Sequence, residues 1–452
     1  MTTLSRQHLL QEIERLPQVR TIGRVVAVKG LLIECSGIEE MLSVGARCAV
    51  HGTLSDDHEV LCEVVGFREK VALLMPFGSV EGVGLGAKVS LVAAQSAVEP
   101  SAAWLGRVID PMGNPIDGKG PLMRGGVPYL LRADPLAASQ RARVGAKMDM
   151  GVRAINTFLT TCRGQRLGIF SGSGVGKSIL MSMLARYSQA DVNVIGLVGE
   201  RGREVKEFIE QILGEDGMAR AVVVATPADN PPLMRMHGAA MATSIAEYFR
   251  DTGRHVLLLM DSLTRYAQAN REIALTIGEP PATRGFPPSV FARLPQLVER
   301  AGMGVGGHGS ITAFYTVLTE ADDPNDPVAD SARAILDGHI VLSRRLAERG
   351  LYPAIDIESS ISRVMSQVVG DRQIKYARAL KHFYSLYEQN ADLFNVGAYQ
   401  RGANLELDSA VAMRPQILEF LRQDRRAAVN FSDAVTALAQ VTGGDVIDAE
   451  AT

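Results

Sequence analysis

The sequence is poor in several features that mark particular classes of protein. Its four cysteines form no C-x-x-C pair, so zinc-binding and thiol-redox motifs have no support. No apolar run approaches the length of a membrane span, and no signal peptide opens the chain. The formal net charge is −3, which argues against an overall basic surface for nucleic acid. We therefore expect buried thiols in a reducing compartment and a soluble, cytoplasmic protein.

The chain is long and apolar enough to build several domains. Its 452 residues, 46% of them apolar, correspond to two or three domains at roughly 150 residues each. Short β-branched runs separated by glycines from 20 to 95 predict a small all-β barrel. Apolar strand-like runs then alternate with helical stretches, which predicts an α/β domain over 96–370 with a mostly parallel sheet. Residues 371–452 have helical periodicity and form the expected C-terminal helical domain.

Residues 1–19 are expected to form an amphipathic helix. Within 4–16, Leu9, Leu10, Ile13 and Leu16 share one helical face, and a proline ends the pattern. Such a short helix could pack on its own domain or dock into a groove of a partner protein.

The most informative segment, here called the phosphate loop, reads Ser171-Gly172-Ser173-Gly174-Val175-Gly176-Lys177-Ser178. It follows an apolar run at 167–170 and precedes another at 179–181, so a strand leads into the loop and a helix leaves it. Glycines let backbone N–H groups approach phosphate oxygens, and the helix N-terminus favours an anion. Lys177 would reach the β- and γ-phosphates, and the Ser178 hydroxyl would bind Mg²⁺. The segment predicts binding of a nucleoside triphosphate.

The loop departs from the strict motif at one position. The pattern G-x-x-x-x-G-K-[ST] has glycine where this chain has Ser171. The alternative is a glycine-rich turn that ends in Lys-Ser by chance. The flanking strand and helix favour the nucleotide site.

Two carboxylates follow apolar runs in positions that suit ATP hydrolysis. Asp261 ends the run 256–260, where a Walker-B aspartate would stand, although it could also cap the next helix. Glu200 follows the run 194–198, at the strand end where doubly wound sheets assemble ligand sites. There it could polarise the attacking water. The neighbouring charges Arg203 and Glu204 are expected to form surface salt bridges.

Several longer segments carry a family resemblance. They are 105–118 (LGRVIDPMGNPIDG), 199–204 (GERGRE), 261–267 (DSLTRYA), 279–291 (EPPATRGFPPSVF), 319–344 (TEADDPNDPVADSARAILDGHIVLSR) and 351–356 (LYPAID). Together they resemble the catalytic subunits of rotary ATP synthases. Those at 279–291 and 319–344 resemble still more the ATPases of type III secretion, in the flagellum-specific branch. The resemblance implies that the α/β domain is RecA-like.

The resemblance also implies roles for individual residues. Lys177 and Ser178 would bind phosphate and magnesium, Asp261 would be the Walker-B carboxylate, and Glu200 the catalytic one.

Three further roles rest on the resemblance alone. Arg363, in the segment 359–364, matches an arginine finger that reaches a neighbouring subunit's nucleotide. Tyr352 matches the aromatic residue that packs against adenine, with a core tyrosine as the alternative. Arg201 matches an arginine beside the γ-phosphate, with a structural ion pair as the alternative.

The implied function is Mg²⁺-dependent ATP hydrolysis coupled to flagellar type III protein export. One chain holds both Glu200 and Arg363, so identical subunits could complete each other's sites in a homohexamer, with residues 280–290 lining its channel. The expected partners are a regulator or stator protein at residues 4–16, a central stalk protein, the export gate and substrate–chaperone complexes. The expected place is the cytoplasmic face of the flagellar basal body.

Three alternatives stay open at this point. A virulence-type injectisome ATPase would have the same chemistry and fold. A hexameric RNA translocase would need stacking aromatics, but residues 20–95 contain only Phe67 and Phe77 and no tyrosine or tryptophan. A nucleotide-binding subunit without turnover would resemble the non-catalytic partners in rotary rings, which have glutamine where this chain has Glu200.

Overall fold

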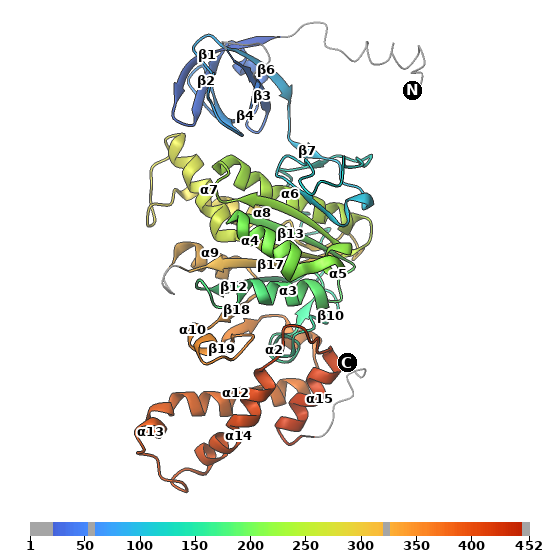
Figure 1. Cartoon of the computed structure of the whole chain (residues 1–452), viewed down its shortest axis with the longest axis vertical. Coiled ribbons are helices and arrows are strands. Elements are labelled where there is room, and N and C mark those ends of the chain that lie inside the picture. The colour runs from blue at the N-terminus through green and yellow to red at the C-terminus, as the bar shows by residue number, and fades with distance from the viewer. Residues whose placement is uncertain (1–20, 53–58, 320–325, 445–452) are drawn as a thin grey trace. The chain divides into compact units, whose positions relative to one another are not determined.

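The computed structural model of the protein describes residues 21–52, 59–319 and 326–444. The chain divides into two compact units (Figure 1). The first runs to Ser96 and includes Ile273–Glu279, and the second contains the remainder. The expected helix at 1–19 lies outside the described residues. None of the helices within those described ranges is long and apolar enough to cross a membrane.

The first unit contains a closed antiparallel barrel, drawn in blue in Figure 1. Its strands follow the order β1-β2-β5-β4-β3-β6, and β6 closes onto β1. The strands are β1 (Ile22–Lys29), β2 (Leu32–Ser36), β3 (Arg47–His51), β4 (Glu59–Arg68), β5 (Val71–Pro76) and β6 (Lys88–Ala93), with a 3₁₀ turn η1 (Glu39–Met41). Alternate side chains of β1 are buried, as a strand with one face on a core requires. The predicted barrel is confirmed, although β3 and β6 lie outside the four β-branched runs that predict it, which are 22–28, 31–35, 59–65 and 71–75.

The second unit is built on a nine-stranded sheet of order β19-β18-β12-β17-β15-β13-β14-β8, with β16 paired to β17. The strands are β8 (Arg107–Ile109), β12 (Arg166–Ser171), β13 (Val192–Glu200), β14 (Ala221–Pro227), β15 (His255–Asp261), β16 (Gly302–Met303), β17 (Ser310–Leu318), β18 (Gly338–Leu342) and β19 (Ile355–Ser362). All pairs are parallel except β16–β17 and β18–β19. The central strands are buried along nearly their whole length, because helices cover both faces. The predicted mostly parallel sheet is confirmed.

Helices and short strands complete this α/β region. They are β7 (Ala97–Val98), η2 (Ala102–Trp104), β9 (Tyr129–Leu130), β10 (Lys147–Met148), α2 (Arg153–Phe158), β11 (Thr161–Cys162), α3 (Lys177–Tyr187), α4 (Gly202–Glu207), the π-helical turn η3 (Phe208–Leu213), α5 (Gly214–Ala219), α6 (Pro232–Asp251), α7 (Leu263–Thr276), α8 (Pro288–Val298), α9 (Pro327–Ile335), α10 (Arg344–Glu348) and α11 (Met365–Val368). Helix α6 is buried along most of its length and packs on β13, β14 and β15.

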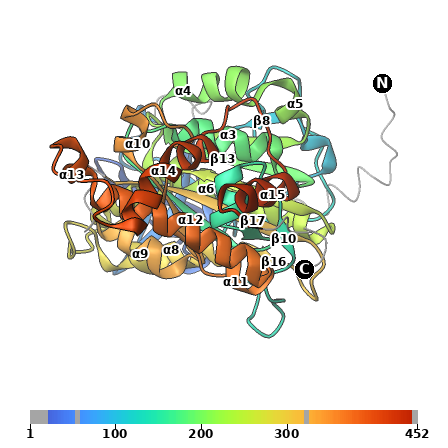
Figure 2. The ribbon, with the colours of Figure 1, turned by 90° about the horizontal axis from the view of Figure 1, so that it is seen from below.

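The C-terminal part is helical, as predicted. It contains α12 (Asp371–Gln389), α13 (Ala391–Asn395), α14 (Leu405–Leu421) and α15 (Phe431–Val441). Figure 2 shows α12, α14 and α15 side by side, and all three pack against α2. Phe158 of α2 meets Phe420 of α14 edge to face, with ring centroids 6.0 Å apart. The boundaries at 95/96 and 370/371 stay predictions.

Candidate nucleotide site

The phosphate loop joins β12 to α3 in the predicted strand–loop–helix order. Strand β12 ends at Ser171, and α3 begins at Lys177. Gly174 and Gly176 have φ angles of +78° and +96°, a region that favours glycine. The Val175 side chain is buried, so that residue offers only its backbone to a ligand. The loop can therefore present a row of backbone N–H groups to an anion.

The ends of neighbouring strands bring three charged residues together beside this loop. Glu200 is the last residue of β13 and Asp261 is the last residue of β15, and these two strands are parallel neighbours. The Lys177 Nζ lies 3.0 Å from Glu200 Oε1 and 2.6 Å from Asp261 Oδ1. The structure thus places the predicted lysine and both predicted carboxylates in direct contact.

The lysine is held in its charged form. Its side chain is only 12% exposed, and burial alone would lower its pKa. The charges and hydrogen bonds of Asp261 and Glu200 outweigh burial and raise the pKa of Lys177. An ammonium has three N–H groups, so Lys177 can hold both carboxylates and still direct a donor at a phosphate.

Lys177 and Glu200 line a cavity of about 820 Å³, here called the nucleotide cavity. It is lined by Gly172, Ser173, Gly174, Gly176, Lys177, Ser178, Ile179, Gly199, Glu200, Arg201, Glu204, Glu207, Ile212, Ala228, Thr264, Arg265, Gln268, Leu318, Thr319 and Arg344. Its volume falls within the range of about 300–1,000 Å³ typical of ligand sites. Two further predicted site residues, Ser178 with its hydroxyl group and the exposed Arg201, also line this cavity.

Arg201 and Tyr352 stand at the edge of this arrangement. Arg201 has an 85% exposed side chain and lies 3.6 Å from Glu204, so the ion pair weighed as its alternative role is present. Tyr352 is 41% exposed and is no core residue. A Cβ built on Gly176 would lie 3.4 Å from the Tyr352 ring, so the ring borders the phosphate loop.

Sequence reasoning missed two residues that support the site. Thr316 of β17 donates a hydrogen bond of 2.6 Å to Asp261 Oδ1. Arg344, at the start of α10, donates to the Ser173 carbonyl of the phosphate loop at 3.3 Å. Thr316 lies in none of the segments that carry the resemblance, and Arg344 is only the last residue of one of them, so neither was assigned to the site; the order of the strands in the sheet brings both residues to it.

Family models match most of the chain. The beta-barrel domain of the ATP synthase alpha/beta family matches residues 18–91, and its nucleotide-binding domain matches 151–362. The T3SS EscN ATPase C-terminal domain matches 369–440. A flagellum-specific ATP synthase of Salmonella typhimurium is 54% identical over 431 residues, covering 94% of both chains. That of Bacillus subtilis is 45% identical and covers 97% of this chain and 99% of its own.

The chain belongs to the flagellum-specific branch of the ATP synthase alpha/beta family. A solved structure of the assembled ATPase EscN, from the type III secretion system of enteropathogenic E. coli, covers 93% of this chain with a TM-score of 0.86 at 40% identity. EscN in complex with its central stalk EscO gives a TM-score of 0.84 at 39% identity. Both EscN chains are covered in full.

The residues at the phosphate loop of this flagellum-specific ATPase can hold the magnesium ion that its family implies. The hydroxyl of Ser178 and the carboxylate of Asp261 are hard oxygen donors, and Lys177 lies close enough to direct phosphate oxygens to the same place. Mg²⁺ is usually held in this way, by one or two protein groups together with substrate phosphates and water.

One of the predicted site residues does not lie near the others. Arg363 follows β19, is exposed, and donates through Nη2 to the Arg333 carbonyl at 3.0 Å. As far as the structure describes the chain, the lining of the nucleotide cavity does not include it. The structure therefore brings together Lys177, Glu200 and Asp261 but leaves Arg363 at the surface of the single chain.

Proposed function

We propose that the chain is the ATPase of a flagellar type III export apparatus, with sites completed at the subunit interfaces of a homohexameric ring. The observation that carries the proposal is the contact of Lys177 with both Glu200 and Asp261 at the phosphate loop. A nucleotide-binding subunit without turnover has no need of a carboxylate at position 200. ATP hydrolysis also agrees with the family to which the chain belongs.

Each group at the cavity has a distinct task in hydrolysis. Backbone N–H groups of the loop bind the phosphates, and Lys177 neutralises charge on the β- and γ-phosphate oxygens. Glu200 orients a water molecule and accepts its proton as the water oxygen attacks the γ-phosphorus and ADP leaves. A magnesium ion held by Ser178, with Asp261 behind it, would neutralise the charge that develops on the phosphates. Arg201 lies at the cavity edge, where it could approach the γ-phosphate.

We expect a further cation from a neighbouring chain. Arginine fingers supplied by another chain raise turnover by about 10³–10⁵-fold. The exposed Arg363 can serve a neighbouring copy, because each copy provides both an acceptor site and a finger. The assembled state of the relative EscN, named in its solved structure, supports a ring.

The proposed function also implies several partner proteins. A central stalk protein would occupy the ring, and the solved complex of EscN with its central stalk EscO supports such a partner. The export gate, substrate–chaperone complexes and a regulator at residues 4–16 would complete the machinery at the cytoplasmic face of the basal body. Residues 280–290 would line the channel of the ring.

Two alternatives are less well supported. An injectisome ATPase would share the fold, but the relative with the flagellar name is 54% identical and EscN 40%. An RNA translocase needs exposed stacking aromatics on its barrel. Of the two barrel phenylalanines, Phe67 is exposed and Phe77 is buried.

Deletion of the gene, followed by complementation, tests the proposal. We expect the deletion strain to lose motility and filament-protein export, and the native gene to restore both. Glu200→Gln should restore neither, whereas Glu210→Gln, an exposed carboxylate on η3, should behave as the native gene. Loss of effector secretion with intact motility would instead identify an injectisome ATPase. Purified chain without ATPase activity would refute the enzymatic part.

A further inference from the structure

Gly199, which precedes the carboxylate Glu200 in β13, interrupts the regular pairing of that strand. Val198 pairs with Thr226 of β14, but the next pair joins Glu200 to Pro227. Strand β13 therefore has two residues where β14 has one, and Gly199 is the extra residue of a β-bulge. Its φ angle of +74° lies in the left-handed region, which residues with a side chain rarely adopt.

The two faces of β13 pack on different helices. A Cβ built on Gly196 would lie 3.0 Å from the Cβ of Ala242 on α6, so the even-numbered positions of the strand face that helix. Ile195 and Leu197 belong instead to the core cluster that contains Leu180 of α3. The odd-numbered positions therefore face the side of the sheet on which α3 follows the phosphate loop.

The extra residue transfers Glu200 from the first face to the second. In a strand without a bulge, position 200 would face α6, because a shift of one residue moves a side chain to the opposite face. Since Gly199 takes no place in the register, Glu200 has the orientation of Leu197 instead. Leu197 pairs with Asp261 of β15, so both carboxylates lie on the face that Lys177 reaches.

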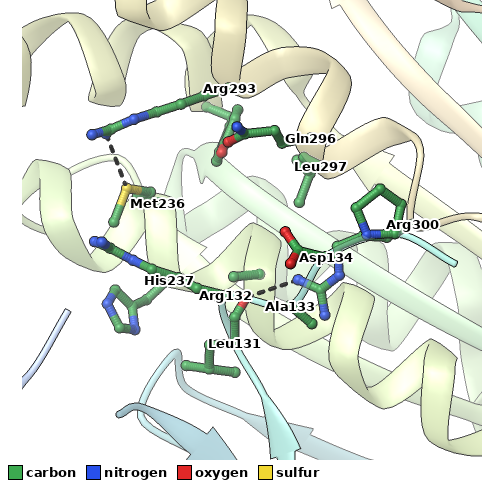
Figure 3. A pocket seen from close by; sticks show the side chains of 13 residues that line it. Leu131, Arg132, Ala133, Asp134, Met236, His237, Arg293, Gln296, Leu297 and Arg300 are labelled. Carbon is green, nitrogen blue, oxygen red and sulfur yellow. Dashed lines mark hydrogen bonds between the residues drawn. The ribbon is translucent and has the colours of Figure 1, made fainter. Parts of the chain in front are cut away.

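Helix α6 leads away from the phosphate loop. Through Met236 and His237 it borders a second cavity, of about 220 Å³ (Figure 3). Within the part of the chain that the structure describes, this cavity and the nucleotide cavity have no lining residue in common. A strand without the bulge would thus direct Glu200 to a part of the molecule that is separate from the nucleotide.

The bulge leaves no room for a side chain at position 199. A Cβ built on Gly199 would lie 2.8 Å from the Cβ of Arg265 and 2.9 Å from its Cγ, distances that real Cβ atoms do not show. The Arg265 Cβ is fixed by the backbone of α7, whose N–H at this residue donates to the Ser262 hydroxyl. It cannot move aside as the tip of a long side chain could. A side chain at 199 would therefore displace the end of β13, and Glu200 with it.

We infer that Gly199 is a positioning residue for ATP hydrolysis, whose bulge turns Glu200 toward Lys177 and the phosphates. The inference rests on the role proposed for Glu200 in activating water. Gly199 offers no side chain to the reaction and acts through Glu200. A substitution at 199 should therefore reduce turnover more than ATP binding, because the phosphate loop itself is unchanged.

Kinetics and nucleotide binding of purified full-length variants test the inference. We expect Gly199→Ala to lower kcat about 10²-fold or more, whereas the Kd for a fluorescent ATP analogue should change less than about threefold. Gly253→Ala is the matched control. Gly253 also has a left-handed φ angle, +86°, and a Cβ there would also lie 2.8 Å from a side chain, the His308 ring. It precedes β15, at the opposite end of that strand from Asp261, so this variant should keep the native kcat.

A second substitution guards against a failure of Gly199→Ala to fold, which thermal unfolding would reveal. Asparagine adopts the left-handed region more readily than alanine, so Gly199→Asn has less backbone strain. Its Cβ would meet Arg265 in the same way, and it should lower kcat with little effect on Kd as well.

A double variant distinguishes positioning of Glu200 from general damage to the site. Gly199→Ala/Glu200→Gln should hydrolyse ATP no more slowly than Glu200→Gln alone in single-turnover assays, because residues that act as a unit have non-additive effects. Two results would overturn the inference: a kcat for both Gly199 variants close to that of Gly253→Ala, or a double variant slowed by the full product of the single effects. Normal turnover in Glu200→Gln would instead count against the proposed function, so the two failures are distinguishable.

Discussion

The ammonium nitrogen of Lys177 lies 2.6 Å from Asp261 Oδ1 and 3.0 Å from Glu200 Oε1, so one cation holds two carboxylates with different tasks. Asp261 is fixed from a second side by the Thr316 hydroxyl, whereas Glu200 stands at the border of the nucleotide cavity. Asp261, which is held on two sides, is therefore suited to lie beside a metal ion, and Glu200, which borders the cavity, is suited to contact a water molecule. Substitutions of Glu200 and of Asp261 should therefore affect different properties of the enzyme.

Glu200→Gln should retain ATP binding and lose hydrolysis by about 10²–10⁴-fold, because the amide keeps the size of the side chain but cannot accept a proton. Lys177→Ala should weaken both binding and hydrolysis, since it removes the charge that faces the phosphates. Titration with a fluorescent ATP analogue and a steady-state phosphate-release assay measure the two properties. Normal turnover in Glu200→Gln would refute the assigned role.

Mixing of two inactive variants tests whether the site is shared between chains. Arg363→Ala should bind ATP but hydrolyse it slowly, and Glu200→Gln should do the same for another reason. In rings assembled from equal amounts of both, about one interface in four would combine a native Glu200 with a native Arg363. Activity should then reappear in the mixture. If the mixture stays as inactive as its components, Arg363 does not act across an interface.

The sequence predicts those parts of the structure that depend on local order. Glu200 and Asp261 follow apolar runs, and the phosphate loop lies between a run and a helix, so all three could be placed at strand ends in advance. Strand β3 (Arg47–His51) was missed because its five residues include charged and polar side chains and no clear alternation. Thr316 was missed for a different reason. It meets Asp261 only because β17 pairs with β15, and the order of strands in a sheet is not written in the chain.

Tyr352→Ala should raise the KM for ATP, whereas Tyr352→Phe should leave it nearly unchanged. The Tyr352 ring borders Gly176 of the phosphate loop and is partly exposed, so its face is available to a base. Stacking of a base on an aromatic ring contributes about 1–3 kcal/mol, which corresponds to roughly a 5- to 150-fold change. Steady-state kinetics over a range of ATP concentrations measure the effect. An equal rise in KM for both variants would show that the hydroxyl, and not the ring, matters.

The four cysteines should be inert toward thiol reagents in the folded protein. All are free and buried, which confirms the expectation from their spacing. Burial raises the pKa of Cys35 and Cys162 to about 12 and that of Cys48 to about 11, and it raises the pKa of Cys62 as well. Since the thiolate is the reactive form, a chromogenic disulfide reagent at pH 8 should label none of them until denaturant exposes all four. Rapid labelling of the native protein would contradict this burial.

Asp117→Asn should destabilise the second unit at neutral pH but not at acidic pH. Burial alone would raise the pKa of Asp117, but hydrogen bonds from Arg107 and from the backbone of Lys119 and Val108 outweigh it and hold the pKa well below its usual range. A carboxyl whose pKa is depressed by folding stabilises the protein above its unfolded pKa of about 3.9, and this contribution disappears as the pH falls further.

The variant should therefore lose about 1–3 kcal/mol at pH 7, because the amide leaves the largely buried Arg107 without its charged partner. Thermal unfolding midpoints at a series of pH values measure the loss, and the native and variant curves should converge as the pH falls below about 4. Asp216→Asn, at an exposed position of α5, is the matched control and should shift the midpoint little at any pH. If the difference in unfolding midpoint between the native protein and Asp117→Asn did not change with pH, the stabilisation would come from the shape of the side chain at position 117 and not from its charge.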